Sequence, residues 1–189
     1  ILVVAGFLSV RHFYFQPREV KAQAAMYKGE IYFAKDSFEL ALKGNGADFV
    51  GFEAIADDYS STKAGNLAAA YAGICYYNLG KDAEALAYLK KFDGDDAFLS
   101  PNIEAMIGNC YANMDQYDDA IKAFEKAAKK ADNEMASPVF LQKAATVAEK
   151  MGNYKKALDF YQKIKDEYSQ SMIGRDIDKY IERAKAHVK

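Results

Sequence analysis

Proline, histidine and cysteine are scarce in this chain of 189 residues, which contains three, two and two of them. With so little proline and half of its residues apolar, the chain is neither disordered nor collagen-like. His12 and His187 stand near opposite ends of the sequence, and neither belongs to a cluster with metal-ligand spacing. The sequence therefore predicts no metal site, no cofactor and no catalytic centre.

Charge and glycine placement narrow the choice of function further. The formal net charge is −2 and no domain-sized basic patch appears, so nucleic acid is not an expected partner. The acidic pairs Asp57-Asp58 and Asp118-Asp119 lack the alternating loop and closing Glu of a calcium hand. The glycine-rich stretch 44–51 lacks the Lys-Ser/Thr ending of a phosphate loop. These absences favour a protein that binds other proteins over an enzyme.

The segment from Asn66 to Ala128 contains two copies of one sequence pattern. Gly73 matches Gly108 at an offset of 35 residues (108 − 73). The same offset pairs Cys75 with Cys110, Tyr76 with Tyr111 and Ala85 with Ala120. A period near 34 made of two helical patterns and a turn is typical of tetratricopeptide repeats. The sequence therefore predicts an all-α fold of stacked helical pairs.

Weaker copies on both sides extend the pattern to about four repeats. The first copy is interrupted by three glycines in the segment 43–51, which we expect to form either a surface loop or a functional insertion. A helix over Asp176–Val188 is expected to cap the array, since a last repeat otherwise exposes apolar surface. The predicted divisions are a membrane anchor at 1–16, repeats at 17–65, 66–99, 100–136 and 137–171, and a capping helix at 172–189.

Serine and threonine stand where several of these helices are expected to begin. Ser100-Pro101 and Ser137-Pro138 are expected to cap and open the third and fourth repeats, because Ser accepts orphan amide hydrogen bonds and Pro fits a first turn. The segments Ile55–Gly65 and Ile164–Gly174 share a Tyr-Ser pair followed by a further hydroxyl residue. In both segments we expect the tyrosine to fill a hydrophobic seam and a hydroxyl to cap the next helix.

The first fifteen residues do not follow the repeat pattern. Ile1–Val10 is apolar apart from Ser9, and Phe13-Tyr14-Phe15 follows a short basic pair. About fifteen helical residues span roughly 22 Å, short of the roughly 30 Å hydrocarbon core of a membrane. We therefore expect a chain that lacks its true beginning and carries the second half of a transmembrane helix, ending in an aromatic belt. A cleaved signal ending near Ala22-Gln23-Ala24 and a buried core helix are the alternatives.

The small and aromatic positions of the repeats resemble the tetratricopeptide consensus. The residues that carry this resemblance are Gly73, Tyr76, Gly80, Ala85, Leu89, Gly108, Tyr111, Tyr117, Ala120, Phe124 and Ala127. Ala145 and Ala148 depart from it, since glycine and tyrosine are usual there. The small residues are expected to let paired helices approach closely.

In layout, a membrane span followed directly by such repeats resembles the YfgM-type proteins of bacterial inner membranes. That resemblance implies a single-pass protein whose repeats lie in the periplasm, associate with the Sec translocon and cooperate with a membrane-anchored prolyl isomerase chaperone. The Tyr-Ser helix endings also resemble periplasmic repeat lipoproteins that assist outer-membrane assembly. A secreted or soluble envelope scaffold with a cleaved signal is therefore the alternative function.

The first helix of each repeat is expected to line a concave face that binds extended segments of partner proteins. Asn109 and Asn113 lie one helical turn apart, and their amides both donate and accept hydrogen bonds, which suits a peptide backbone. Lys150 is the only basic residue on this predicted face, so we predict a neutral groove. The predicted contact residues are Met26, Glu30, Phe33, Ile74, Tyr77, Asn78, Asn102, Asn109, Asn113, Gln142 and Thr146.

Cys75 and Cys110 hold the same place in adjacent repeats. Packed helices lie about 8–10 Å apart, whereas a disulfide needs Cα atoms within about 4.4–6.8 Å. We therefore predict that both cysteines are small buried packing residues.

Overall fold

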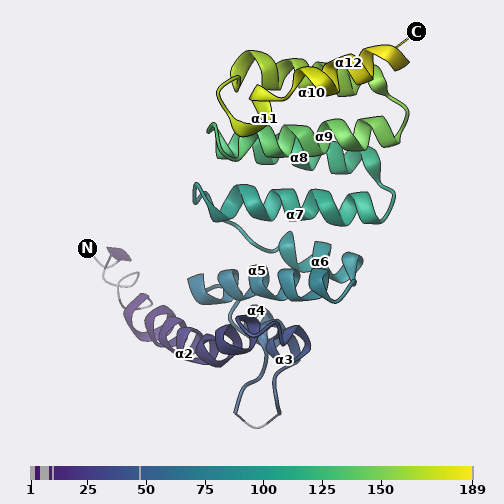
Figure 1. Ribbon diagram of the computed structural model, residues 1–189. Coiled ribbons are helices and arrows are strands. Elements are labelled where there is room, and N and C mark those ends of the chain that lie inside the picture. Colours follow the sequence, from purple (N-terminus) through teal and green to yellow (C-terminus); the bar gives the residue numbers. More distant parts are fainter. Residues whose placement is uncertain (1–2, 5–8, 10, 47, 189) are drawn as a thin grey trace. The chain divides into compact units, whose positions relative to one another are not determined.

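The computed structural model describes residues 3–4, 9, 11–46 and 48–188, and every regular element in those ranges is helical (Figure 1). This confirms the predicted all-α class. The chain divides into two compact units, Ile1–Asp93 and Gly94–Lys189, which are described separately below.

The N-terminal unit begins with a short π-helix, η1 (Arg11–Phe15), which runs directly into α2. Its other helices are α2 (Gln16–Phe33), α3 (Phe38–Lys43), α4 (Phe52–Asp58), α5 (Lys63–Asn78) and α6 (Asp82–Leu89). Helices α2 and α5 pack on each other and on the short helices between them.

Aromatic rings fill the centre of this unit. The ring of Phe52 stacks on Tyr71 with centroids 4.6 Å apart, and Phe33 meets the same tyrosine edge-on at 5.0 Å. A Cβ at Gly29 of α2 would come within 2.5 Å of the Phe49 ring and 2.7 Å of the Phe52 ring. Helix α2 therefore approaches the aromatic cluster as closely as it does because residue 29 has no side chain.

The glycine-rich insertion is held to the unit by one of its own side chains. Phe49 is buried, and the Asn45 side chain accepts hydrogen bonds from the backbone N–H groups of Asp48 and Phe49. Gly44 and Gly51 flank the loop with φ of 79° and 90°. A Cβ on Gly44 would collide with the backbone of residues 49–51, and a Cβ on Gly51 with the backbone of residues 42–44. The insertion thus splits the second helix of the first repeat into α3 and α4 and anchors the break through Phe49.

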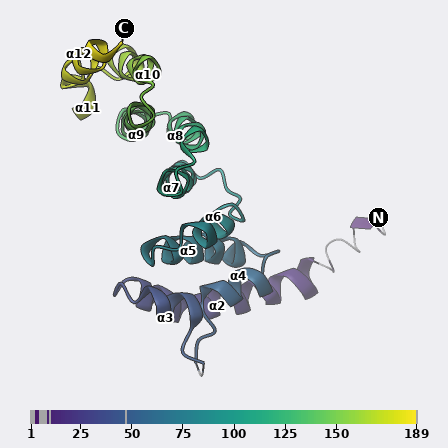
Figure 2. The same ribbon diagram turned by 90° about the vertical axis from the view of Figure 1, so that its right-hand side faces the viewer.

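The C-terminal unit is built from α7 (Leu99–Asn113), α8 (Tyr117–Ala131), α9 (Ser137–Lys150), α10 (Tyr154–Glu167), α11 (Met172–Arg175) and α12 (Asp178–His187). Figure 2 shows α7 and α9 in one layer and α8 and α10 in the other, viewed nearly along their axes. The expected capping helix is divided into α11 and α12, and α12 covers α10 with buried Ile181 and Ala184.

One turn recurs between the paired helices, at four places along the chain. A residue with positive φ stands in each turn, namely Asp36, Gly80, Asp115 and Gly152. The residue that follows donates its N–H five positions back, to the carbonyls of Tyr32, Tyr76, Tyr111 and Ala148 respectively. This left-handed helix ending is a standard C-terminal cap. The acceptors are the aligned tyrosines of the sequence pattern and the alanine that departs from it.

The predicted serine caps of the third and fourth repeats are wrong. Ser100 and Ser137 are buried inside the first turns of α7 and α9, and neither caps its helix. Each hydroxyl instead donates back to a preceding carbonyl, that of Gly94 or Ala128. Ser100 is the second residue of α7 and Ser137 the first of α9, and the hydroxyl of each holds the segment before its helix instead of capping the helix.

The hydroxyl caps predicted from the Tyr-Ser segments are confirmed. Thr62 Oγ1 accepts the N–H of Gly65, and Ser171 Oγ accepts the N–H of Gly174, each at 2.9 Å. Both glycines face a tyrosine carbonyl so closely that an added Cβ would lie 2.0 Å from it. The two segments therefore repeat one complete helix-entry structure.

The predicted membrane anchor at 1–16 gains no support from the described residues. Residues 1–2, 5–8 and 10 of that segment lie outside them. Within the part of the chain that the structure describes, no helix combines the length and the apolar character needed to cross a membrane. Phe13, Tyr14 and Phe15 belong to η1 and are 77%, 53% and 41% exposed.

Candidate functional site

In the N-terminal unit, two of the predicted contact residues of α2, Met26 and Glu30, border a small cavity against α5. The cavity has a volume of about 240 Å³ and is lined by Glu19, Gln23, Met26, Glu30, Lys63, Ala64 and Leu67. Met26 is 4% exposed, so it forms the floor of the cavity, whereas Glu30 is exposed at its rim. Glu19 also accepts the N–H groups of Lys63 and Ala64 and thereby caps α5 from the neighbouring helix.

The remaining predicted residues of this unit differ in how far they are available to a partner. Phe33 is half-buried and packs on Tyr71, so it supports α5. Ile74 and Tyr77 are half-buried on α5, and Asn78 is exposed at its end. The Asn78 amide donates to the carbonyl of Ile74 on the preceding turn of the same helix.

In the C-terminal unit, Asn109 lies beside a lysine that the sequence interpretation did not include. Lys143 Nζ of α9 donates to Asn109 Oδ1 of α7 at 3.0 Å and stands 5.6 Å from the centre of the Phe124 ring. Burial lowers the pKa of Lys143. Asn113 is exposed one turn further along α7. The structure thus joins α7 and α9 through a lysine–amide pair on the predicted face.

Asn102, Gln142 and Thr146 complete the predicted set. The Asn102 amide donates to the carbonyl of Phe98, and the Thr146 hydroxyl donates to that of Gln142. Both side chains therefore donate a hydrogen bond to a backbone carbonyl four residues earlier, as short polar side chains commonly do. Asn102 lies in the first turn of α7, two turns from Asn109, beside the exposed ring of Phe98.

The predicted face carries more cations than the single lysine expected from the sequence. Lys143 is half-buried within it, and Arg183 of α12 pairs with Glu149 of α9 at 2.7 Å. Lys150 lies 3.6 Å from Asp115 and 4.7 Å from the centre of the Tyr117 ring. Lys143 and Arg183 were missed because neither stands at an inward-facing position of the repeat pattern: Lys143 lies elsewhere on α9, and Arg183 belongs to α12.

A polar cluster in the N-terminal unit was also missed. The Tyr76 hydroxyl donates to Glu53, and the single hydroxyl proton of Tyr88 is shared between Glu53 at 3.3 Å and Asp57 at 3.0 Å. Lys43 pairs with Glu53 and Lys91 pairs with Asp57. Burial opposes ionisation of both carboxyls, yet the hydrogen bonds from the lysines and tyrosines lower the pKa of each. The cluster ties α4 to α5 and α6, and every group in it has a partner, which favours a structural role.

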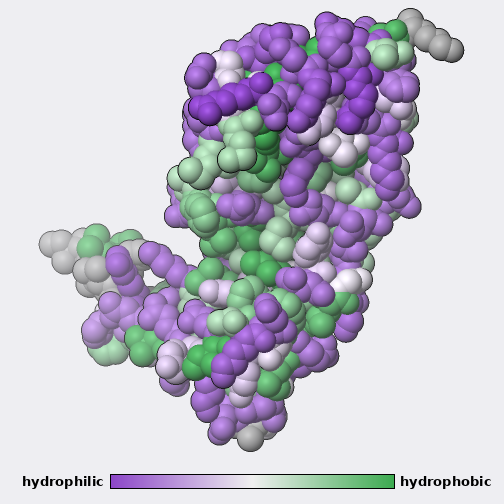
Figure 3. Space-filling view, viewed as in Figure 1, coloured by the Kyte–Doolittle hydropathy of each residue, from purple (hydrophilic) through white to green (hydrophobic). Residues whose placement is uncertain are grey.

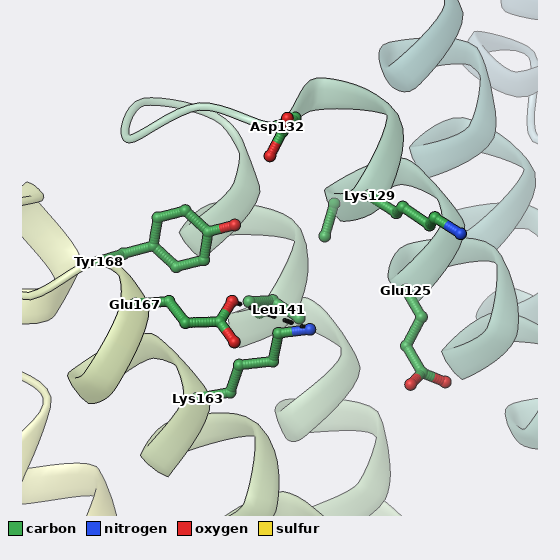
Figure 4. Close-up of a pocket in the computed structure, with 8 residues that line it drawn as sticks. Glu125, Lys129, Asp132, Leu141, Lys163, Glu167 and Tyr168 are labelled. Carbon is green, nitrogen blue, oxygen red and sulfur yellow. Dashed lines mark ion pairs between the residues drawn. The ribbon is translucent and has the colours of Figure 1, made fainter.

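A larger cavity of about 470 Å³ opens between α8 and α10 (Figure 4). Leu141 of α9 lies at its base, and Glu125 and Lys129 border it from α8 while Lys163 and Glu167 border it from α10. Lys163 and Glu167 form an ion pair at 3.9 Å. Charges of both signs alternate around an open mouth, an arrangement that selects no particular ligand.

The cysteines and histidines take the places expected of structural residues. Cys75 and Cys110 are fully buried, which confirms that both pack inside the fold, and burial raises the pKa of Cys75 to about 12. His12 hydrogen-bonds Gln16 in η1–α2, and His187 stacks on Tyr154. Among the described residues, no three His, Cys, Asp or Glu side chains gather as metal ligands.

Comparison with family models finds tetratricopeptide repeats at residues 71–93, 105–134 and 141–171. These segments contain the second half of α5 with α6, most of α7 with α8, and most of α9 with α10. Comparison with curated proteins finds no match. The matches carry the general resemblance to tetratricopeptide repeats and do not extend to the YfgM-type family.

Proposed function

We propose that this chain, in which tetratricopeptide repeats occupy parts of residues 71–171, is a protein-interaction module that binds extended segments of partner proteins. Asn109, Asn113 and Lys143 form its central contact group. Proteins with such repeats generally bind proteins or peptides, and the first helices of the matched segments carry these polar groups on one face.

The observation that carries this proposal is the Lys143–Asn109 pair. The Lys143 side chain is half-buried, and burial lowers its pKa. Holding the charged ammonium in this position therefore costs solvation free energy. A lysine ammonium has three N–H donors. A backbone carbonyl or carboxylate of an incoming partner could therefore accept a hydrogen bond from Lys143 in addition to the one that Asn109 accepts. A polar group maintained in this way on an open face is better suited to binding than to packing.

A photo-crosslinking amino acid at Asn113 tests the proposal in the cells that make the protein. The same amino acid at Lys122, which is exposed on α8, provides the matched control. We expect defined protein adducts from position 113 that are absent from position 122. Identical adducts from both positions, or none from 113, would refute binding at this face.

We further propose that the module is anchored at the inner membrane of a bacterial envelope, with its repeats in the periplasm beside partners of protein export or folding. The support is the apolar stretch Ile1–Val10 and the aromatic residues Phe13, Tyr14 and Phe15, whose exposed rings suit a membrane interface. Fractionation of the full-length protein tests the location. Recovery in the membrane pellet after a carbonate wash supports the anchor, and a mature chain beginning near Ala25 would replace it with a cleaved signal.

A further inference from the structure

Three large apolar side chains stand at equivalent, exposed places in the C-terminal unit. Phe98, Met135 and Met172 follow one another at intervals of 37 residues (135 − 98 and 172 − 135). They are 80%, 85% and 89% exposed. We call these three residues the apolar ladder. Figure 3 shows hydrophobic surface gathered along the edge of this unit where Figure 1 places α11 and the start of α7.

The exposure of the ladder is a property of the fold. Five residues after each member comes a buried apolar residue, Ile103, Phe140 or Ile177, exposed by 3%, 5% and 1%. The repeat register is therefore the same in all three places, and the ladder position is the one that carries a large, strongly exposed apolar side chain in each. In the N-terminal unit, where Thr62 corresponds to the capping Ser171, the position equivalent to Met172 is Lys63. The ladder thus belongs to the C-terminal unit.

Local hydrogen bonds fix the backbone that presents the first two members. Asp96 Oδ1 accepts the N–H groups of Phe98 and Leu99 at 2.8 and 2.6 Å. Asn133 Oδ1 accepts those of Met135 and Ala136 at 3.0 and 2.8 Å. Because Asp96 and Asn133 are themselves 37 residues apart, one cap has been used twice to hold an apolar side chain toward solvent. Such preorganisation lowers the entropy cost of binding.

A depression lies between each pair of successive members. One of about 300 Å³ is lined by Phe98, Met135 and Val139 together with neighbouring residues of α7 and α9. The next, of about 400 Å³, is lined by Met135, Val139 and Met172 with Pro138, Ser171 and Ile173. The two depressions share Met135 and Val139, so they form one apolar strip along the ends of successive helices. Exposed strips of this kind mark interaction sites.

The charges around the strip identify the kind of partner it fits. Glu134 is the single ionisable side chain among the residues that line the two depressions. Asp95 and Asp96 precede Phe98, and Asp132 stands three residues before Met135; all four acids are exposed. Nearby cations are Arg175, beside Met172, and Lys130, which donates to Ser100 Oγ and pairs with Glu104. An apolar strip with an acidic border complements a segment whose apolar side chains are flanked by Lys or Arg.

We propose that the apolar ladder docks a cationic amphipathic helix of a partner protein. The apolar face of the helix fills the two depressions, and its basic residues lie against Asp95, Asp96, Asp132 and Glu134. This surface is formed by the starts of α7, α9 and α11, and it does not include Asn109 or Asn113. It is therefore a second binding surface, separate from the proposed contact group.

Fluorescence anisotropy with a labelled 18-residue amphipathic peptide of Leu and Lys tests the proposal on the full chain. The double substitution Met135→Ser/Met172→Ser should weaken binding by about tenfold or more, since the loss of two central apolar contacts dominates such interfaces. Met114→Ser/Met151→Ser is the matched control, because these methionines are also 37 residues apart and lie at the opposite ends of α7 and α9. It should leave binding within about twofold of the wild type.

The same peptide tests the role of the acidic border and the independence of the apolar ladder from the proposed contact group. Asp132→Asn/Glu134→Gln should weaken binding and flatten its dependence on salt, and a Leu-Glu peptide with the same apolar face should bind poorly. Asn109→Ala/Asn113→Ala should leave binding unchanged, so a failure of the proposed function does not affect this result. Circular dichroism melts establish that each variant is folded.

Several outcomes would overturn the proposal. They are equal losses in the ladder and control variants, no loss in either, or tighter binding of the Leu-Glu peptide. Ladder-dependent binding to phosphatidylglycerol vesicles without ladder-dependent peptide binding would assign the strip to a membrane. Concentration-dependent self-association that Met135→Ser/Met172→Ser abolishes would assign it to a second copy of the chain.

Discussion

Tyr76 and Tyr88 stack with ring centroids 5.5 Å apart, and both hydroxyls donate to the same carboxylate oxygen of Glu53. The tyrosines come from α5 and α6, whereas Glu53 comes from the helix that follows the insertion. This arrangement fastens α4 to the next repeat even though the helix pair to which it belongs is interrupted.

Tyr88→Phe should destabilise the N-terminal unit by about 1–2 kcal/mol, because it removes the hydroxyl that serves both Glu53 and Asp57 and leaves those acceptors short of a donor. Tyr27→Phe, at a 67% exposed position of α2, is the control and should change stability little. Thermal melts monitored by circular dichroism measure both. Equal melting temperatures for the two variants would show that the cluster contributes nothing.

Acid should weaken the same unit. The pKa values of Glu53 and Asp57 are lowered in the folded state, so their contribution is fully present above the unfolded pKa of about 4 and is lost as pH falls through the folded values. Glu53→Gln/Asp57→Asn should therefore flatten the decline of the melting temperature between about pH 5 and pH 2. A decline as steep as that of the wild type would place the acid sensitivity elsewhere.

Gly108→Leu should destabilise the C-terminal unit by at least about 1–3 kcal/mol, the usual cost of overpacking. Even a Cβ at this position would lie 2.8 Å from the Phe124 ring, which is 2% exposed and has no room to move. Glu125→Leu, on the exposed side of α8, introduces the same side chain without a collision. The two variants are compared by urea denaturation, and a Gly108→Leu midpoint equal to that of Glu125→Leu would contradict the packing argument.

The fold was largely predictable because its packing rules are local in sequence. Gly73 and Gly108 allow helices to approach, a Cβ at Gly73 would lie 2.6 Å from Leu89, and the aligned tyrosines accept the same turn hydrogen bond in successive repeats. The roles of Ser100 and Ser137 were not predictable, because a cap and a buried loop anchor have the same local sequence. The anchoring of the insertion by Phe49 depends on contacts with α2 that no local pattern records.

The candidate site was less predictable, because a repeat pattern assigns faces but not partners. It placed Asn109 and Asn113 one turn apart on the same helix, as α7 has them, and their contact with a partner stays a prediction. It did not reveal that Lys143 bonds Asn109, since that contact joins residues 34 positions apart on separate helices. The apolar ladder was not predicted from the sequence for a different reason. Phe98, Met135 and Met172 lie outside the consensus positions of the repeat, so the repeat pattern gives no reason to align them.

Helix-entry caps provide a quantitative test of the corrected serine roles. Ser171→Ala should cost about 1 kcal/mol, because it removes the acceptor for the N–H of Gly174 at the start of α11. Ser137→Ala should cost a similar amount for another reason: the Asn133 N–H loses its acceptor, and the Ala128 carbonyl loses one of its two donors and keeps the N–H of Asp132. Hydrogen exchange separates the two. Ser171→Ala should speed exchange at Gly174, and Ser137→Ala at Asn133; exchange at Gly174 that is faster in both variants would contradict these assignments.

The charge of Lys143 determines which segments the proposed contact group accepts. Lys143→Gln keeps a donor near Asn109 Oδ1 and removes the positive charge, whereas Asn109→Ala removes the amide and keeps the charge. If the partner presents neutral backbone, Asn109→Ala should weaken binding by about fivefold or more and Lys143→Gln by much less, since a lost neutral hydrogen bond is worth about 1 kcal/mol. A carboxylate-bearing partner should reverse this order and make binding sensitive to salt. Titration with the partner captured at position 113 distinguishes these cases, and wild-type affinity in both variants would remove Asn109 and Lys143 from the binding site.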